Sequence, residues 1–195
     1  MANKNKVEFG TKECHVGLYT VDPVTGEATL EAPQKVPGMR ALTLEAESEE
    51  YKFYADDVVY YSEYNDNGMT GELNMALFPD EFKLSFLNYT TTTDGGVAQV
   101  KGMQGKQVYI AFQGAGDKHN RRHLILNVSL GAITREHKTI EESREVEEES
   151  IPFTAVGDNK SGILRVSYNV GDAGYETVFT APTVPVIGDV DTEGN

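Results

Sequence analysis

Histidine and carboxylate side chains are the groups in this chain whose spacing could support metal binding or hydrolysis. His119 and His123 are four residues apart, the spacing by which a helix presents two zinc ligands. Here the pattern predicts a turn that leads into a strand, where this spacing places the two imidazoles too far apart to share a metal. A metal-dependent hydrolase using these histidines is therefore the least favoured interpretation, and we expect no metal site.

The other candidate reactive groups also have simpler structural interpretations. The acid pairs Asp56–Asp57 and Asp80–Glu81 could act in acid–base catalysis, but adjacent carboxylates usually cap helices or face solvent. Gly114–Gly116 lacks the third glycine and the helix of a dinucleotide-binding loop. Cys14, the one cysteine, is expected to pack inside a strand. We therefore predict no enzyme activity and no cofactor.

Composition sets further bounds on the class of protein. A chain of 195 residues can bury one core, and its wealth of Tyr, Val, Thr and Gly favours β structure. The net charge of −14 argues against conventional DNA binding, which needs a basic surface. No apolar run approaches the ~20 residues that span a bilayer, so we expect no membrane insertion. The lone cysteine and the absence of a signal-like start indicate synthesis in a reducing cytoplasm.

The segment 51–87 organises the predicted fold. Alternation over Val58–Glu63 predicts a strand, Asn65–Gly68 predicts a turn, and period-two spacing over Met69–Leu77 predicts an antiparallel return strand. Pro79–Leu87 then predicts a short helix, because Pro and acids suit its first turn. Phenylalanines at three- to four-residue spacing in and before this helix would form one apolar stripe.

The same patterns predict the rest of the chain. Glu45–Glu50 is expected to be an exposed loop or the end of a hairpin, and Asn88–Gln104 a mobile loop. The fold class is mainly β, a β-sandwich or partly closed β-barrel with one short α-helix packed at its edge, plus extended terminal arms. The predicted parts are an N-terminal arm at 1–13, a β domain at 14–180 and a C-terminal arm at 181–195. Further strands are expected at Cys14–Val21, Glu27–Glu31, Arg40–Ala46, Gly105–Phe112 and Arg121–Ile133, with a last hairpin of Ile163–Val170 and Tyr175–Phe179.

Several sequence stretches carry a resemblance to a known family. The opening MANKNKVEFG and the stretches KVPGMRALTLEAE, FYADDVVYY, NDNGMTGELNMALFPDEF and IPFTA resemble the major tail tube proteins of long-tailed, non-contractile bacteriophages (siphophages). The resemblance runs from Met1 to about Ala155. It implies a structural subunit that forms rings, hexameric in the family, which stack into a hollow tube and conduct the genome during ejection.

The resemblance also implies contacts, partners and a location. The partners are other copies of the chain, the tape measure protein, the tail terminator and distal tail proteins, while genome DNA passes without specific binding. The product is a late protein of the virion tail, assembled in the host cytoplasm. Candidate subunit contacts lie in the arms and the acidic loop: Lys4, Val7, Phe9, Glu47, Glu49, Glu50, Pro182, Val184, Pro185 and Ile187.

An acidic channel wall would repel phosphates, and two acidic stretches could supply it. For the run at 141–149, a solvated outer face is the competing interpretation, and the sequence leaves both open. The candidate lumen residues are Asp56, Asp57, Glu141, Glu145, Glu147 and Glu149.

A monomeric β-sandwich that binds carbohydrate or a receptor is the alternative function. Such a module needs an exposed aromatic platform. The sequence offers one in Tyr54, Tyr60, Tyr61 and Tyr64.

Overall fold

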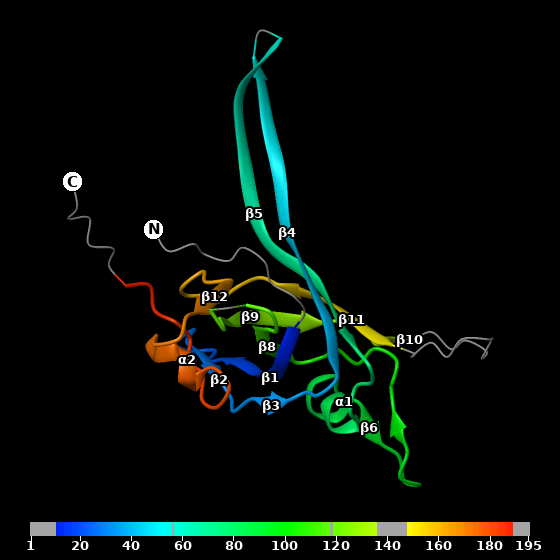
Figure 1. The fold of residues 1–195 in the computed structure, drawn as a ribbon. Coiled ribbons are helices and arrows are strands. Elements are labelled where there is room, and N and C mark those ends of the chain that lie inside the picture. The colour runs from blue at the N-terminus through cyan, green and yellow to red at the C-terminus, as the bar shows by residue number, and fades with distance from the viewer. Residues whose placement is uncertain (1–10, 56, 118, 136–147, 189–195) are drawn as a thin grey trace, which may run out of the picture.

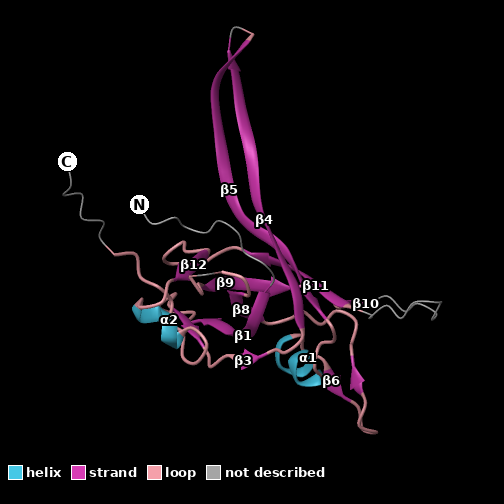
Figure 2. Ribbon diagram, viewed as in Figure 1, coloured by secondary structure: helices cyan, strands magenta, loops and turns pink. Residues whose placement is uncertain are grey.

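The computed structural model describes residues 11–55, 57–117, 119–135 and 148–188 of the 195-residue chain, and these are mainly β, as predicted. Two short helices accompany the strands (Figure 2). The elements are β1 (Thr11–Val21), β2 (Ala28–Leu30), β3 (Gln34–Lys35), β4 (Met39–Ala55), β5 (Val58–Met75), α1 (Asp80–Phe86), β6 (Thr90–Thr91), β7 (Val97–Ala98), β8 (Gln107–Gly114), β9 (Arg122–Leu130), β10 (Thr134–Arg135), β11 (Glu149–Ala155), β12 (Arg165–Tyr168) and α2 (Ala173–Thr177).

One large antiparallel sheet forms the body of the molecule (Figure 1). Its strands follow the order β2-β1-β8-β9-β11-β5-β4, with β3 beside β1, β10 beside β11 and β12 beside β9. The small pair β6–β7 stands apart, within the segment that was predicted as a loop. Segments far apart in the sequence thus meet in the sheet, because β8 lies between β1 and β9.

The main core lies between one face of this sheet and α1. It combines side chains of β1, β5, β8, β9 and β11 with the predicted phenylalanine stripe. Phe78, Phe82 and Phe86 are all buried, and the rings of successive members lie 5.1 Å apart. The helix predicted at Pro79–Leu87 is confirmed by α1, which spans Asp80–Phe86. As expected, Pro79 precedes its first turn and the phenylalanine stripe is buried.

A second core covers the opposite face of β8 and β9. Tyr109 and Leu124 on that face are fully buried beneath Val178 of the C-terminal segment. The predicted last hairpin is wrong, since β12 pairs with β9 and residues 173–177 form α2. Tyr175 and Val178 are three residues apart, so a helical turn places both on one face and buries both. In a strand, residues with this spacing would point to opposite faces.

The hairpin of β4 and β5 is much longer than predicted. The chain reverses between Ala55 and Val58, which pair with each other. Asp57 there has a φ of 61°, and Asn65–Gly68 continues β5. The turn predicted at Asn65–Gly68 is therefore wrong, and Gly68 instead forms an irregularity in the pairing, with a φ of 120°. Of the two alternatives for Glu45–Glu50, the loop is wrong, because this stretch is a strand of the hairpin and pairs with β5.

Candidate assembly surface

The outer part of the β4–β5 hairpin, residues 47–68, extends away from the body, and we call it the hairpin arm (Figure 1). Within the body, β5 pairs with both β4 and β11. The pairing with β11 covers Met69–Met75, so it stops at Met69, next to the arm. Among the described residues, the strands of the arm pair only with each other. The arm is thus a two-stranded ribbon, a structure that is marginally stable by itself in water.

Large apolar side chains cover the hairpin arm and face solvent. Tyr60 is 77% exposed, Tyr64 is 68% exposed and Tyr54 is 61% exposed. Single exposed apolar residues are common, but a contiguous group of this size marks an interaction surface. The other exposed members of the group are Tyr51, Phe53, Val58, Val59 and Tyr61.

These side chains lie on both faces of the ribbon. In antiparallel strands, directly opposed residues point to the same face. From Glu50 to Phe53 the pairing is regular, and Tyr61 lies opposite Phe53 while Tyr64 lies opposite Glu50. Because Tyr61 and Tyr64 are three residues apart in this regular part of β5, they point to opposite faces, and each face carries at least one aromatic side chain. Neither face is covered by the rest of the described chain.

The hairpin arm is strongly acidic, and its one basic side chain is paired with one of its carboxylates. Lys52 forms an ion pair with Glu50 at 2.8 Å, and the hydrogen bond from Lys52 to that carboxylate raises the pKa of Lys52. The Tyr61 hydroxyl donates to Glu63 at 2.8 Å, and this hydrogen bond raises the pKa of Tyr61. Residues 47–68 contain seven acidic residues and one basic residue, hence a net charge of −6 out of −14.

Two glycines fix the hairpin arm to the body. A Cβ at Gly68 would collide with the carbonyl oxygen of Ala155, and one at Gly71 would collide with the Thr43 carbonyl and the Phe153 ring. The Asp66 carboxylate accepts the Gly68 N–H at 3.1 Å and supports the irregular backbone there. This close packing sets the direction in which the arm leaves the sheet.

The structure brings several predicted site residues together on the hairpin arm. Glu47, Glu49 and Glu50 all lie in β4 with exposed side chains, and Asp57 lies at the tip. The four tyrosines of the proposed aromatic platform are also there. Sequence reasoning missed Tyr51, Phe53, Val58 and Val59, although their apolar character beside a polar run was a usable signal.

One predicted lumen residue does not fit its assigned place. Glu149 is 4% exposed, and its carboxylate accepts the Phe78 N–H at 2.7 Å and lies 3.5 Å from Arg135. A residue that lines a channel must be exposed, so Glu149 is a structural group that joins β11 to the segment before α1. Outside the described residues lie Lys4, Val7, Phe9, Asp56, Glu141, Glu145 and Glu147.

The described part of the predicted C-terminal arm, residues 181–188, begins on the body of its own chain. Pro182 is buried, Pro185 is half-buried, and Val184 packs against the second core. Ile187, in contrast, is 66% exposed. Of these residues, Ile187 is the one whose exposure suits a contact with another molecule.

The two histidines considered for metal binding lie in different environments. His119 is exposed, whereas His123 is buried with Nδ1 2.7 Å from the Ser167 hydroxyl. Within the described ranges, no three His, Cys, Asp or Glu side chains are grouped as metal ligands would be. No helix in the described part of the chain is long and apolar enough to cross a bilayer.

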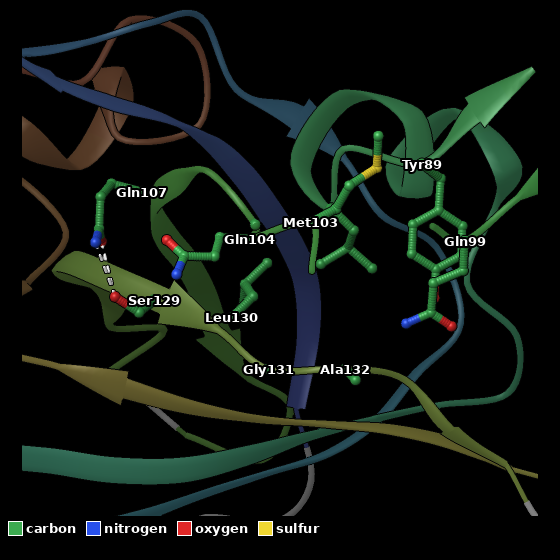
Figure 3. A pocket seen from close by; sticks show the side chains of 11 residues that line it. Tyr89, Gln99, Met103, Gln104, Gln107, Ser129, Leu130, Gly131 and Ala132 are labelled. Atoms are coloured by element: carbon green, nitrogen blue, oxygen red, sulfur yellow. Dashed lines mark hydrogen bonds between the residues drawn. The ribbon is translucent and has the colours of Figure 1, made fainter. Parts of the chain in front are cut away.

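A cavity of about 410 Å³ lies beside the segment that follows α1 (Figure 3). Tyr89, Gln99 and Met103 lie at one end of it, and the hydrogen-bonded pair of Gln107 and Ser129 lies at the other. Sequence reasoning predicted only a loop here. Uncharged residues supply the whole lining: Leu87, Tyr89, Gln99, Met103, Gln104, Gly105, Gln107, Ser129, Leu130, Gly131 and Ala132.

No protein-family model and no curated protein matches this sequence, but solved structures resemble its fold. The PVC sheath/tube terminator of an extracellular contractile injection system, in the extended state, has a TM-score of 0.51 and 10% identity over 86% of this chain and 99% of its own. The anti-feeding prophage cap, a tube-terminating cap, has a TM-score of 0.48 and 12% identity over 87% and 98% of the two chains. The PVC sheath–tube complex gives 0.46 and 11% over 81% and 89%. The chain thus shares its overall fold with the sheath/tube terminator.

Proposed function

We propose that this protein is a structural subunit of a tail-like tube and that copies associate through the hairpin arm. The observation that carries the proposal is the exposed aromatic surface on both faces of a ribbon with open edges. Open strand edges and uncovered aromatic groups both favour association with another chain. The fold shared with a sheath/tube terminator supports a structural role in a tail and a function without catalysis.

The finer proposal follows the resemblance to siphophage major tail proteins. Subunits form rings, hexameric by that resemblance, and the rings stack into a hollow tube that conducts the genome during ejection. Partners would be the tape measure, terminator and distal tail proteins, with assembly in the host cytoplasm. The net charge of −14 supports a channel that lets DNA pass without binding it, because bound DNA needs a basic surface.

Within that tube, the acidic wall is proposed on sequence grounds for Glu141, Glu145 and Glu147. Asp57 lies at the tip of the hairpin arm, which suits a contact with another copy as well as a place in the lumen. Reversing the charge of the three glutamates should leave tubes intact and slow genome ejection. Unchanged ejection kinetics in such tubes would remove these residues from the lumen.

The proposal is tested by electron microscopy of the purified protein over a concentration series, with light scattering for mass. Wild type is expected to form rings or tubes, and Tyr54→Ser/Tyr60→Ser should raise the concentration needed by about tenfold or more. Val24→Ser/Val170→Ser is the matched control, because these residues are 90% and 64% exposed on the body. Assembly that is equally sensitive to both double variants, or absent from wild type, contradicts the proposal.

A carbohydrate-binding module is the second candidate, favoured by the exposure of Tyr54, Tyr60 and Tyr64. Sugar rings stack on exposed aromatic faces, which these side chains could supply. A glycan array probed with the monomeric fraction tests it. Binding that is lost in Tyr54→Ser/Tyr60→Ser would favour this function over assembly.

A further inference from the structure

We propose that the cavity beside α1 receives the tip of the hairpin arm from another copy of the chain. An aromatic side chain of the tip enters the cavity, and the acidic tip lies against Lys101 and Lys106 of the receiving copy. The inference rests on the proposed function, since it names the surface that the hairpin arm recognises. It commits to a second copy as the occupant.

The chemistry of the cavity suits a tyrosine. A volume of about 410 Å³ is in the range of small-ligand pockets, roughly 300–1,000 Å³. Leu87, Met103 and Leu130 offer apolar contacts for a ring, while three glutamine side chains in the lining offer amide groups to a phenol hydroxyl. Tyr60 supplies that combination, because its side chain is the most exposed aromatic group on the described hairpin arm.

The charges around the two surfaces are complementary. The segment 95–107, which supplies five of the lining residues, contains Lys101 and Lys106 and no acid. Both lysines are exposed, and neither takes part in an ion pair between described residues. The tip of the hairpin arm contains Asp56–Asp57 and no base between Tyr54 and Tyr61. Opposite charges at the edge of a contact increase its specificity and association rate.

The two surfaces lie at opposite ends of the molecule. In Figure 1, the hairpin arm rises from one end of the body, while α1 and β6, which flank the cavity residues Leu87 and Tyr89, lie at the other. A chain therefore cannot fill its own cavity with its own tip. A contact between two different surfaces is heterologous and leaves both surfaces of the assembly available, so it adds copies head to tail. Such a contact would join one ring to the next.

Disulfide trapping tests the contact directly. The single native cysteine, Cys14, is 2% exposed, and burial raises the pKa of its thiol to about 12, so it should not compete. Val58→Cys places a thiol at the tip while keeping Tyr60, and Ala132→Cys places one at the cavity. The two variants, carrying different mass tags, are mixed, assembled and oxidised. Val58→Cys paired with Val24→Cys is the control, because Val24 is exposed in a turn between β1 and β2.

The expected result is a mixed disulfide dimer with Ala132→Cys that is at least about tenfold more abundant than the one with Val24→Cys. Tubes that form without this enrichment overturn the cavity contact and leave the proposed function standing, with another tail protein or a small molecule as the occupant. Wild-type protein that forms no rings or tubes overturns the proposed function and the cavity contact together.

A double-mutant cycle tests the charges independently. Lys101→Glu/Lys106→Glu should raise the assembly concentration by about tenfold, and this loss should shrink in an Asp57→Asn background. Asn keeps the left-handed backbone at position 57 acceptable. Lys12→Glu/Arg165→Glu changes the net charge equally at exposed positions outside the cavity and should leave the cycle additive. Additive losses in both pairs contradict the proposed role of the lysines.

Discussion

Strand β9 and the hairpin arm are both rich in apolar side chains on two faces, yet their surroundings are opposite. Leu124 and Leu126 on one face of β9, and Ile125 and Val128 on the other, are fully buried. Tyr60, in the arm, is 77% exposed. The described residues supply two covering layers for β9, one around α1 and one around α2, and none for the arm. A strand that is apolar on both faces thus needs two covering partners, and under the proposed function other copies of the chain supply them for the arm.

Apolar surface buried in the body and apolar surface buried on the hairpin arm contribute to two different free energies. Burial within one chain contributes to the free energy of unfolding, whereas burial between chains contributes to the free energy of association. Substitutions in the body should therefore change stability, and substitutions in the hairpin arm should change assembly. The following variants test that division, from the largest expected effect on unfolding to the smallest.

Phe82→Ala should have the largest effect. Its ring is fully buried between Phe78 and Phe86, so truncation leaves a cavity that costs about 3–5 kcal/mol of unfolding free energy. Urea denaturation of the unassembled protein, followed by circular dichroism, measures the loss. A change below about 1 kcal/mol would show that α1 is not part of the cooperative core.

Gly71→Ala tests the junction between the two regions. The added methyl group meets the Thr43 carbonyl and the Phe153 ring, and such overpacking costs about 1–3 kcal/mol. Hydrogen exchange should reveal faster opening in β5 and β11 than in β1 and β8. Gly26→Ala is the control for space, because no atom lies within 4 Å of its added Cβ. Alanine at position 26 would be strained by the φ of 70° there. Hydrogen exchange in β5 and β11 should nevertheless become faster in Gly71→Ala and not in Gly26→Ala.

Asp117 provides a pH-dependent prediction in the body. Burial raises the pKa of its carboxyl group, but hydrogen bonds from Arg121 and the His119 N–H outweigh that effect and lower the pKa from 3.8 to about 2. Because the folded pKa lies below the unfolded one, the stabilisation is complete above about pH 4 and is lost as the pH falls toward 2.

Asp117→Asn should therefore cost about 1–3 kcal/mol at pH 7 and lose less stability than wild type on acidification to pH 3. Chemical denaturation at both pH values measures the difference. Asp172→Asn, in another turn, is a comparison carboxylate whose side chain accepts hydrogen bonds from Asn169. Parallel pH profiles of wild type and Asp117→Asn would contradict the prediction.

Tyr60→Ala should have the smallest effect on unfolding, within about 0.5 kcal/mol, because the side chain is exposed in the unassembled subunit. The same variant should weaken assembly strongly. Denaturation and light scattering on one preparation separate the two quantities. A large loss of stability with unchanged assembly would contradict this division and show that the Tyr60 side chain makes a contact within its own chain.

Local patterns predicted the elements whose surroundings are also local. The phenylalanine stripe identified α1, and alternation identified β1 and the lower half of β4, because each of these signals depends on neighbours within a few residues. The predicted turn fell at Asn65–Gly68 because that stretch has the stronger turn composition, whereas the chain reverses between Ala55 and Val58. Pairing along β4 decides the register, and that pairing involves residues far apart in the sequence.

The candidate site was predictable in composition but not in geometry. The glutamates at 47–50 and the four tyrosines were recognised separately, and only the long hairpin shows that they share one ribbon. The cavity could not be predicted, because it combines residues 87–107 with residues 129–132 through the packing of β8 on β9. The burial of Glu149 could not be predicted either, because nothing in the sequence distinguishes it from the neighbouring glutamates.

The pairing of β1 with β8 has a consequence for how quickly the chain folds. It joins His15 to Ala111, so the body closes only after about half of the chain has been brought together. Folding rates fall as contacts become more distant in sequence, and sheets of this kind take milliseconds to seconds. A hairpin such as β4–β5 joins two strands that are consecutive in the sequence, and hairpins form in about 1–10 μs. On a newly made chain, the hairpin arm can therefore form before the body that carries it.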